Sequence, residues 1–278
     1  MSYTAEISRA NPACVVFLVD QSSSMADIAQ GETRQSKAYA VADAINRLLL
    51  ELTIRCAKEE GVRDYFHVGV IGYGHSVGSA FAGALAERDL VPISLIADNP
   101  TRLEQRTRMV PNGAGGLMEA PVSVPIWLEP VMDGPTPMTR ALTYAENIVA
   151  GWTQNHPAGF PPIVLNLSDG ESTDGDPAPA GASILAHATA DGASLLFNLH
   201  VSGAGGQPIS FPDSKAALPD EHSKLLFDMS SVLPSHMRSF AAANGYRVSE
   251  LTRGFVYNSD ISSIARFVDI GTRATGLR

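Results

Sequence analysis

The chain has 278 residues, of which 45% are hydrophobic, and it carries a formal net charge of −9 at pH 7. A chain of this length can bury one sizeable core, so we expect a single domain over residues 1–278. The negative charge argues against binding to nucleic acid, whose backbone attracts lysine and arginine, and no apolar run is long enough to span a membrane.

The first predicted strand runs into a loop of oxygen ligands. Cys14–Val19 is a continuous apolar run, typical of a strand buried on both faces of a parallel sheet, and Asp20, Ser22 and Ser24 follow at alternate positions. Alternate side chains of an extended segment point the same way, so these oxygens can converge on one point. Carboxylate and hydroxyl groups suit Mg²⁺, Ca²⁺ or Mn²⁺. Taken alone, the serines are equally consistent with caps of a helix that begins after Ser24.

The next segments alternate between helix and strand. Apolar positions at helical spacing predict a helix over about 36–58, and 66–73 is the next apolar strand. Residues 75–130 are long and mixed, and we expect them to form an insertion. Within it, Val91–Ala97 is predicted to be an edge strand because it contains Pro92.

Two later segments also place an oxygen-bearing side chain next to the end of a predicted helix or strand. Thr136 lies just before a predicted helix over 139–149, and a predicted strand over 161–167 is followed by Ser168, Asp169 and Gly170. Open parallel sheets place their ligands at the carboxyl ends of strands. Asp20, Ser22, Ser24, Thr136 and Asp169 are therefore expected to meet from three loops on one edge.

The remainder of the chain completes an α/β pattern. We predict strands over 195–201 and 254–257, a closing helix over 260–271, and a second long insertion, a loop, near 203–223. Strands that alternate with helices favour an α/β sandwich. Cys14 and Cys56 are expected to be buried thiols, which fits a reducing compartment. The first residues lack a basic stretch followed by an apolar one, so we expect a cytoplasmic protein.

At this point the chain resembles the von Willebrand factor A (VWA) domain family, in its stand-alone bacterial form. The resemblance rests on three segments: Asp20-Gln-Ser22-Ser-Ser24, Gly134-Pro-Thr136-Pro-Met-Thr-Arg-Ala-Leu142 and Leu167-Ser-Asp169-Gly170. It departs from the family where Gly-Gly-Thr is Gly-Pro-Thr and where Ser23 replaces a glycine. It implies a doubly wound, mostly parallel sheet with helices on both faces and one antiparallel edge strand within 75–130.

The resemblance also implies a function. In the family these positions form a metal-ion-dependent adhesion site, so Asp20, Ser22, Ser24, Thr136 and Asp169 are expected to hold a divalent ion, here Mg²⁺, with Ca²⁺ or Mn²⁺ as alternatives. A partner protein then supplies an Asp or Glu carboxylate to the open position of the ion. The chain is expected to be a binding module and not an enzyme.

Two alternatives compete with this interpretation. Metal and carboxylates could activate water in a hydrolase or phosphotransferase, but the sequence offers no evident nucleophile or base beside the cluster. A degenerate module without metal is disfavoured by the complete ligand set. Glu171, Asp174 and Asp176 are expected to form an exposed acidic rim that attracts cations and repels acidic partners.

Overall fold

The computed structural model describes residues 3–29, 34–111, 116–201 and 207–259. Its helices are α1 (Lys37–Cys56), α2 (Ile93–Asp98), α3 (Met138–Asn155), α4 (Ala178–Ala186), α5 (Glu221–Met229) and α6 (Ser235–Ala243), with 3₁₀ turns η1 (Ser23–Ala26) and η2 (Gly83–Leu85). Its strands are β1 (Ala13–Asp20), β2 (Ala57–Lys58), β3 (Gly61–Val62), β4 (Phe66–Tyr73), β5 (Val77–Ser79), β6 (Val91–Pro92), β7 (Arg102–Pro111), β8 (Leu117–Ile126), β9 (Ile163–Ser168), β10 (Ala188–Thr189), β11 (Gly192–Ala193), β12 (Leu195–Val201), β13 (Ile209–Ser210) and β14 (Phe255–Ser259).

An eight-stranded sheet forms the centre of the molecule, with the order β13-β14-β12-β9-β1-β4-β5 and β6 beside β4. The five consecutive strands β14, β12, β9, β1 and β4 are parallel to one another. β5 is the antiparallel edge strand that was expected within 75–130, and the two-residue strands β6 and β13 are antiparallel as well. The predicted α/β class and mostly parallel sheet are confirmed.

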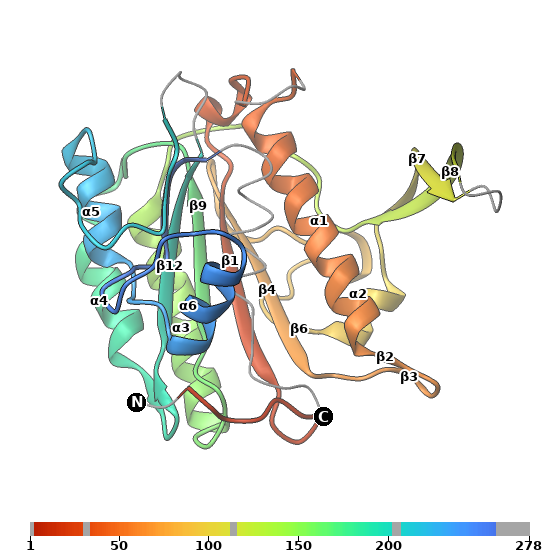
Figure 1. Cartoon of the computed structure of the whole chain (residues 1–278), viewed down its shortest axis with the longest axis horizontal. Coiled ribbons are helices and arrows are strands. Elements are labelled where there is room, and N and C mark those ends of the chain that lie inside the picture. Colours follow the sequence, from red (N-terminus) through yellow and green to blue (C-terminus); the bar gives the residue numbers. More distant parts are fainter. Residues whose placement is uncertain (1–2, 30–33, 112–115, 202–206, 260–278) are drawn as a thin grey trace.

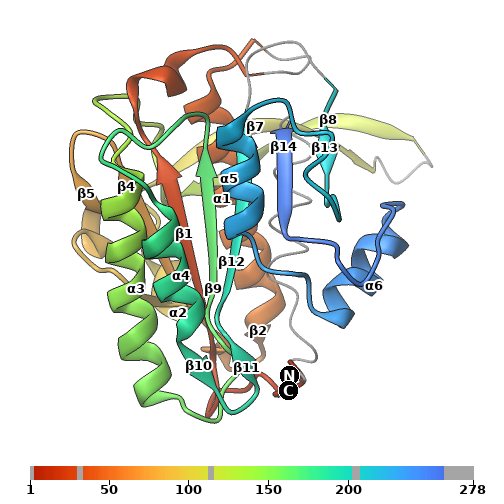
Figure 2. The ribbon, with the colours of Figure 1, turned by 90° about the vertical axis from the view of Figure 1, so that its left-hand side faces the viewer.

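Helices cover both faces of this sheet (Figures 1 and 2). α1, α2 and α6 pack into the hydrophobic cluster on one face, and α3, α4 and α5 pack into the cluster on the other. β1 serves both faces, because Val15 and Phe17 point into the first cluster while Val16 and Leu18 point into the second. This alternation explains why the first strand is apolar at every position.

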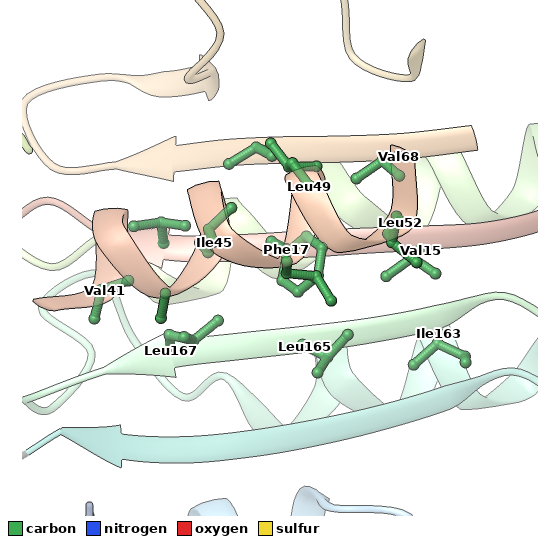
Figure 3. Packing of buried hydrophobic residues seen from close by; sticks show 14 of the residues in the cluster. Val15, Phe17, Val41, Ile45, Leu49, Leu52, Val68, Ile163, Leu165 and Leu167 are labelled. Atoms are coloured by element: carbon green, nitrogen blue, oxygen red, sulfur yellow. The ribbon is translucent and has the colours of Figure 1, made fainter. Parts of the chain in front are cut away.

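The packing of α1 on the sheet shows how the core is built. Figure 3 shows Val41, Ile45, Leu49 and Leu52 on one face of the helix, above Phe17 and its neighbours on the strands. These helical positions repeat every three or four residues, which places them along one stripe of the helix. The predicted helix over 36–58 is confirmed, and Ser36 caps it by accepting a hydrogen bond from the Tyr39 backbone N–H.

The insertion over 75–130 contains the largest departure from the predictions. Val91–Ala97 was predicted to be an edge strand, but only Val91 and Pro92 pair with β4, and Ile93–Asp98 is the helix α2. The prediction was wrong because Ile93 and Ile96, three residues apart, are both buried, as one face of a helix requires.

The same insertion holds a hairpin that the sequence pattern did not reveal. Within the described part of the chain, β7 and β8 pair only with each other, and they extend away from the body of the protein (Figure 1). The base of the hairpin is tied to α1: Asn46 bonds to the backbone of Trp127 and Leu128, and Arg106 pairs with Asp43. Proline and charged residues interrupt the alternation that would have marked these strands.

Three further expectations concern the rest of the chain. Cys14 and Cys56 are both buried, as expected. The predicted closing helix over 260–271 lies outside the described residues, while the predicted loop near 203–223 contains β13 and ends in the first turn of α5. Within the described residues, every helix is too short or too polar to traverse a lipid bilayer.

Candidate metal centre

The carboxyl ends of β1 and β9 lie side by side at one edge of the sheet, as the arrows in Figure 2 show. Asp20 is the last residue of β1 and Ser168 the last of β9. Within the sheet, β4, the next strand of the sheet along the chain, lies on one side of β1, and β9 lies on the other side of β1. This position is a topological switch point, where doubly wound sheets leave a crevice for a ligand.

Four of the five predicted ligand residues form a continuous chain of hydrogen bonds. The Ser22 N–H donates to Asp20 Oδ1 over 2.9 Å, the Ser22 and Ser24 hydroxyls lie 3.0 Å apart, and Ser24 Oγ donates to Asp169 Oδ1 over 2.8 Å. Ser168 closes the arrangement by donating from Oγ to Asp20 Oδ2 over 2.7 Å. The structure therefore brings together oxygen atoms from two loops that are far apart in sequence.

The serines are not helix caps in the way that the alternative interpretation required. Ser22 precedes the short 3₁₀ turn η1, but its side chain makes no capping bond there. The expected helix directly after Ser24 is absent, since α1 begins only at Lys37. Both hydroxyls are thus directed to the cluster and not to a helix terminus.

Among the described residues, no hydrogen bond links the hydroxyl of Thr136, the fifth predicted residue, to this cluster; only its loop is tied to the neighbouring loops, through Gly134 and through the backbone of Thr136. The Ser23 hydroxyl accepts from the Gly134 N–H and donates to the Gly134 carbonyl, and the Ser23 N–H donates to the same carbonyl. Thr136 exchanges two bonds with Thr173: its N–H donates to Thr173 Oγ1, and its carbonyl accepts from the Thr173 N–H. The loop that carries Thr136 is therefore fixed between the two loops that carry the other ligands.

Gly134 is required by the shape of this loop. Its φ is +91°, a conformation that side-chain-bearing residues rarely adopt, and an added Cβ would lie 2.6 Å from the backbone nitrogen of His75. Ser23, which replaces a glycine of the family pattern, supplies the side chain that holds Gly134. The serine at position 23 thus adds hydrogen bonds between its own loop and the loop of Gly134.

The predicted acidic rim is only partly correct. Glu171 and Asp176 are exposed, but Asp174 accepts hydrogen bonds from the N–H groups of Thr139 and Arg140 at the start of α3. Burial acts to raise the pKa of Asp174, but these hydrogen bonds and one from Ser172 hold it below its ordinary value. Pro137, at the N-cap position of α3, has no side chain that can cap, so Asp174 caps the helix from another loop.

Both carboxylates of the cluster are buried. Asp20 is 0% exposed, and so is the side chain of Asp169. Burial raises the pKa of Asp20, the bonds from Ser22 and Ser168 partly offset this rise, and the nearby charge of Asp169 adds to it. A cation at this position would relieve the cost of burying two like charges.

One cation of the protein, Lys37, already lies there, and none of the site predictions from the sequence includes it. Lys37 Nζ lies 2.8 Å from Asp169 Oδ2, and the lysine side chain is only 7% exposed. It also reaches Asp27 Oδ2 at 3.3 Å and the Ser24 carbonyl at 3.5 Å. A signal was present in the sequence: Lys37 lies four residues before Val41, at the head of the buried stripe of α1, so its side chain had to point inward.

The donor set fits a hard divalent ion. The carboxylates of Asp20 and Asp169 and the hydroxyls of Ser22 and Ser24, which the structure connects, are all oxygen donors, as Mg²⁺, Ca²⁺ and Mn²⁺ prefer. The hydroxyl of Thr136 is the further oxygen that the sequence predicts. No group of three His, Cys, Asp or Glu side chains that could hold a metal occurs among the described residues, so the hydroxyls are essential to this assignment. With Lys37, the two buried aspartates leave one uncompensated negative charge at the site.

A hollow with a volume of about 520 Å³ is lined by residues that follow Asp169 in the chain, and not by the cluster residues themselves. Its wall begins two residues beyond Asp169, with Glu171 and Ser172, and continues through the start of α4 to α5. Lys215 pairs with Asp228 and Lys224 pairs with Glu221 on this wall, so Glu171 and Asp176 give the hollow a negative sign. The surface around the site is therefore suited to a neutral or basic partner.

Comparison with known proteins gives matches among solved structures only, since no family model and no curated protein matches the chain. One match is proximal thread matrix protein 1 from the mussel byssus, described with a zinc-occupied MIDAS motif: 14% identity over 96% of this chain and 48% of that one, TM-score 0.46. Others are the pilus adhesin SpaC from Lactobacillus rhamnosus GG (12% identity, 96% and 31% covered, TM-score 0.49) and manganese-loaded TRAP from Plasmodium vivax (8%, 93% and 72%, TM-score 0.44).

The chain spans less than half of several of these proteins. It covers 39% of the vWF domain structure of the pilus tip protein Mfa5 from Porphyromonas gingivalis, at 16% identity and TM-score 0.33. At such identities and TM-scores the likeness says nothing about what this chain binds. The VWA-like α/β fold is stated from the strand order and the layers of the structure itself.

Proposed function

We propose that the protein is a divalent-cation-dependent binding module for another protein. Asp20, Ser22, Ser24, Thr136 and Asp169 hold the cation, directly or through water, and a carboxylate of the partner completes its coordination. The observation that carries this proposal is the hydrogen-bonded chain of oxygen groups at the sheet edge, which buries one uncompensated negative charge.

Charge arithmetic supports a single acidic ligand. The two aspartates and Lys37 sum to −1, a divalent ion brings the site to +1, and one carboxylate brings it to zero. A second carboxylate would again leave a buried negative charge, which is costly. The negative hollow whose wall begins at Glu171, two residues after Asp169, then favours a partner on which this Asp or Glu stands alone in neutral or basic surroundings.

Magnesium is expected to stabilise the protein. If the dissociation constant is ~0.1 mM, then ~1 mM Mg²⁺ adds about 1.4 kcal/mol to the free energy of unfolding by mass action. For a chain of this length that corresponds to a rise of about 3 °C in Tm. Thermal unfolding in Mg²⁺ and in excess EDTA measures this difference, and equal melting temperatures would show that no ion is held with this affinity.

Partner binding is expected to depend on the ion and on one acidic residue. Affinity capture in Mg²⁺ with the wild type, with Asp20→Asn and with Asp98→Asn identifies proteins retained by the site, because Asp98 is an exposed carboxylate on α2, away from the cluster. We expect the partner to be retained by wild type and Asp98→Asn and released by EDTA. Changing the partner's critical Glu to Gln, or Asp to Asn, should nearly abolish binding, since a neutral amide lacks the Coulomb attraction to the ion.

Two results would count against the proposal. Capture at full strength in excess EDTA would place the interface elsewhere on the protein. A magnesium-dependent hydrolysis of phosphate esters that is lost in Ser22→Ala would instead favour the enzyme alternative.

A further inference from the structure

Lys37 is an unusual neighbour for a cation site. Its ammonium group is bound to Asp169 Oδ2, while the other oxygen of the same carboxylate accepts from Ser24. A lysine is rarely as buried as this one, at 7% exposure, unless it is paired. Its second carboxylate contact, Asp27, has a side chain that is 70% exposed, so solvent screens the charge of Asp27.

The two oxygens of Asp169 would contact two different cations, Lys37 and the divalent ion. Asp169 Oδ2 is bound by Lys37, and Asp169 Oδ1 accepts a hydrogen bond from Ser24, one of the two serines that would bind the ion. Two positive groups that share one carboxylate repel each other, and they do so strongly here because both aspartates are buried. Lys37 must therefore weaken the hold of the site on a divalent ion.

The same charge has the opposite effect on an anion. Without Lys37, a divalent ion on two aspartates would form a site of zero net charge, and the arriving carboxylate would be attracted less strongly than with Lys37 present. With Lys37, the loaded site carries a net positive charge that persists until the carboxylate binds.

We propose that Lys37 sets the charge of the site: it lowers the affinity for the divalent ion and raises the affinity of the loaded site for a carboxylate. This inference rests on the proposed function, since it concerns the same ion and the same ligand. Lys37 is a positioning and charge-setting residue, and it does not itself coordinate the ion. It also explains how the metal-free protein tolerates the buried Asp169, whose charge Lys37 balances.

The test measures ion and anion separately in Lys37→Met. Mn²⁺ binding is followed by the electron paramagnetic resonance signal of free Mn²⁺, and carboxylate binding by the relaxation of acetate methyl protons near protein-bound Mn²⁺. We expect Lys37→Met to bind Mn²⁺ about tenfold more tightly and to bind acetate several-fold more weakly at saturating Mn²⁺. Lys37→Arg, which retains the charge, should stay within about threefold of wild type in both measurements.

Lys58→Met is the matched control, because Lys58 is an exposed lysine in β2, just after the end of α1. It removes the same charge from the protein and should change neither affinity. If Lys37→Met is insoluble, Lys37→Gln supplies the same readout with a polar side chain of similar length.

The outcomes separate the two proposals. Folded Lys37→Met or Lys37→Gln that binds Mn²⁺ no more tightly than wild type would overturn the role of Lys37 and show that it only supports Asp169. A wild-type protein that takes up no Mn²⁺ would overturn the proposed function itself.

Discussion

Asp20→Asn is expected to weaken Mg²⁺ binding by about 100-fold or more, equivalent to about 2.7 kcal/mol, because it removes one of the two buried negative charges that face the ion. Asparagine keeps the size of the side chain and an oxygen that can accept from the Ser22 N–H, so the strand end need not rearrange. Isothermal titration with Mg²⁺ measures the loss directly, and Asp98→Asn, an exposed carboxylate, is the control.

The same variant tests whether the loss is local. The pKa of Asp20 is raised on folding, so its charge lowers stability as pH rises between the unfolded and the folded pKa, and the whole cost is present above both. In EDTA at neutral pH, Asp20→Asn should therefore melt no lower than wild type. A variant that melts well below wild type would assign Asp20 a structural role, and undiminished Mg²⁺ affinity would remove it from the site.

Phe17→Ala is expected to cost about 3–5 kcal/mol of the free energy of unfolding, the usual range for a large aromatic residue removed from a core. Phe17 is 0% exposed and pairs in register with Val70 on β4 and Leu165 on β9, beneath α1. The cavity would lie between the central strand and its helix, where neighbouring strands hold the backbone and limit collapse. Figure 3 shows the helix residues that would lose their contact.

Chemical denaturation measures this loss, and in a thermal melt of a chain of this size Tm should fall by about 6–11 °C. Leu103→Ala is the control: Leu103 is 63% exposed on the hairpin, so its removal should change stability by less than about 0.5 kcal/mol. Phe17→Ala should still bind Mg²⁺ below its melting temperature, because β1 keeps its pairing with β4 and β9. A loss smaller than about 1 kcal/mol would mean that the core can close over the gap.

The central strands and main helices could be predicted from the sequence because their signals are local. β1, β4, β9 and β12 are apolar runs buried on both faces, and α1 and α3 carry apolar stripes at helical spacing. Asp20 and Asp169 could be placed near one another because the neighbouring parallel strands β1 and β9 put their carboxyl ends on one edge. Their role as ion ligands stays a prediction until the titration is done.

Local pattern failed where a contact with a distant segment decides the outcome. Val91–Ala97 has strand-like composition, yet burial of Ile93 and Ile96 against the sheet makes it a helix. The prediction that Asp174 belongs to the exposed rim is wrong, because nothing in its own segment shows that it caps α3, whose first turn lies 35 residues earlier in the chain. Such a cap depends on how two loops pack against each other, and a short stretch of sequence carries no information about that packing.

The sequence by itself determined the central strands, the helices α1 and α3, and the oxygen-bearing side chains that follow β1 and β9, because hydrophobic periodicity and turn residues act over a few positions. Only the tertiary structure decided the charge of the site. The Ser24–Asp169 bond joins residues 145 positions apart, and the Lys37–Asp169 pair joins residues 132 positions apart. The burial of both carboxylates beside Lys37 follows from the packing of α1 over the edge of the sheet. The resulting net charge would set the affinities of the site for a divalent ion and for a carboxylate ligand.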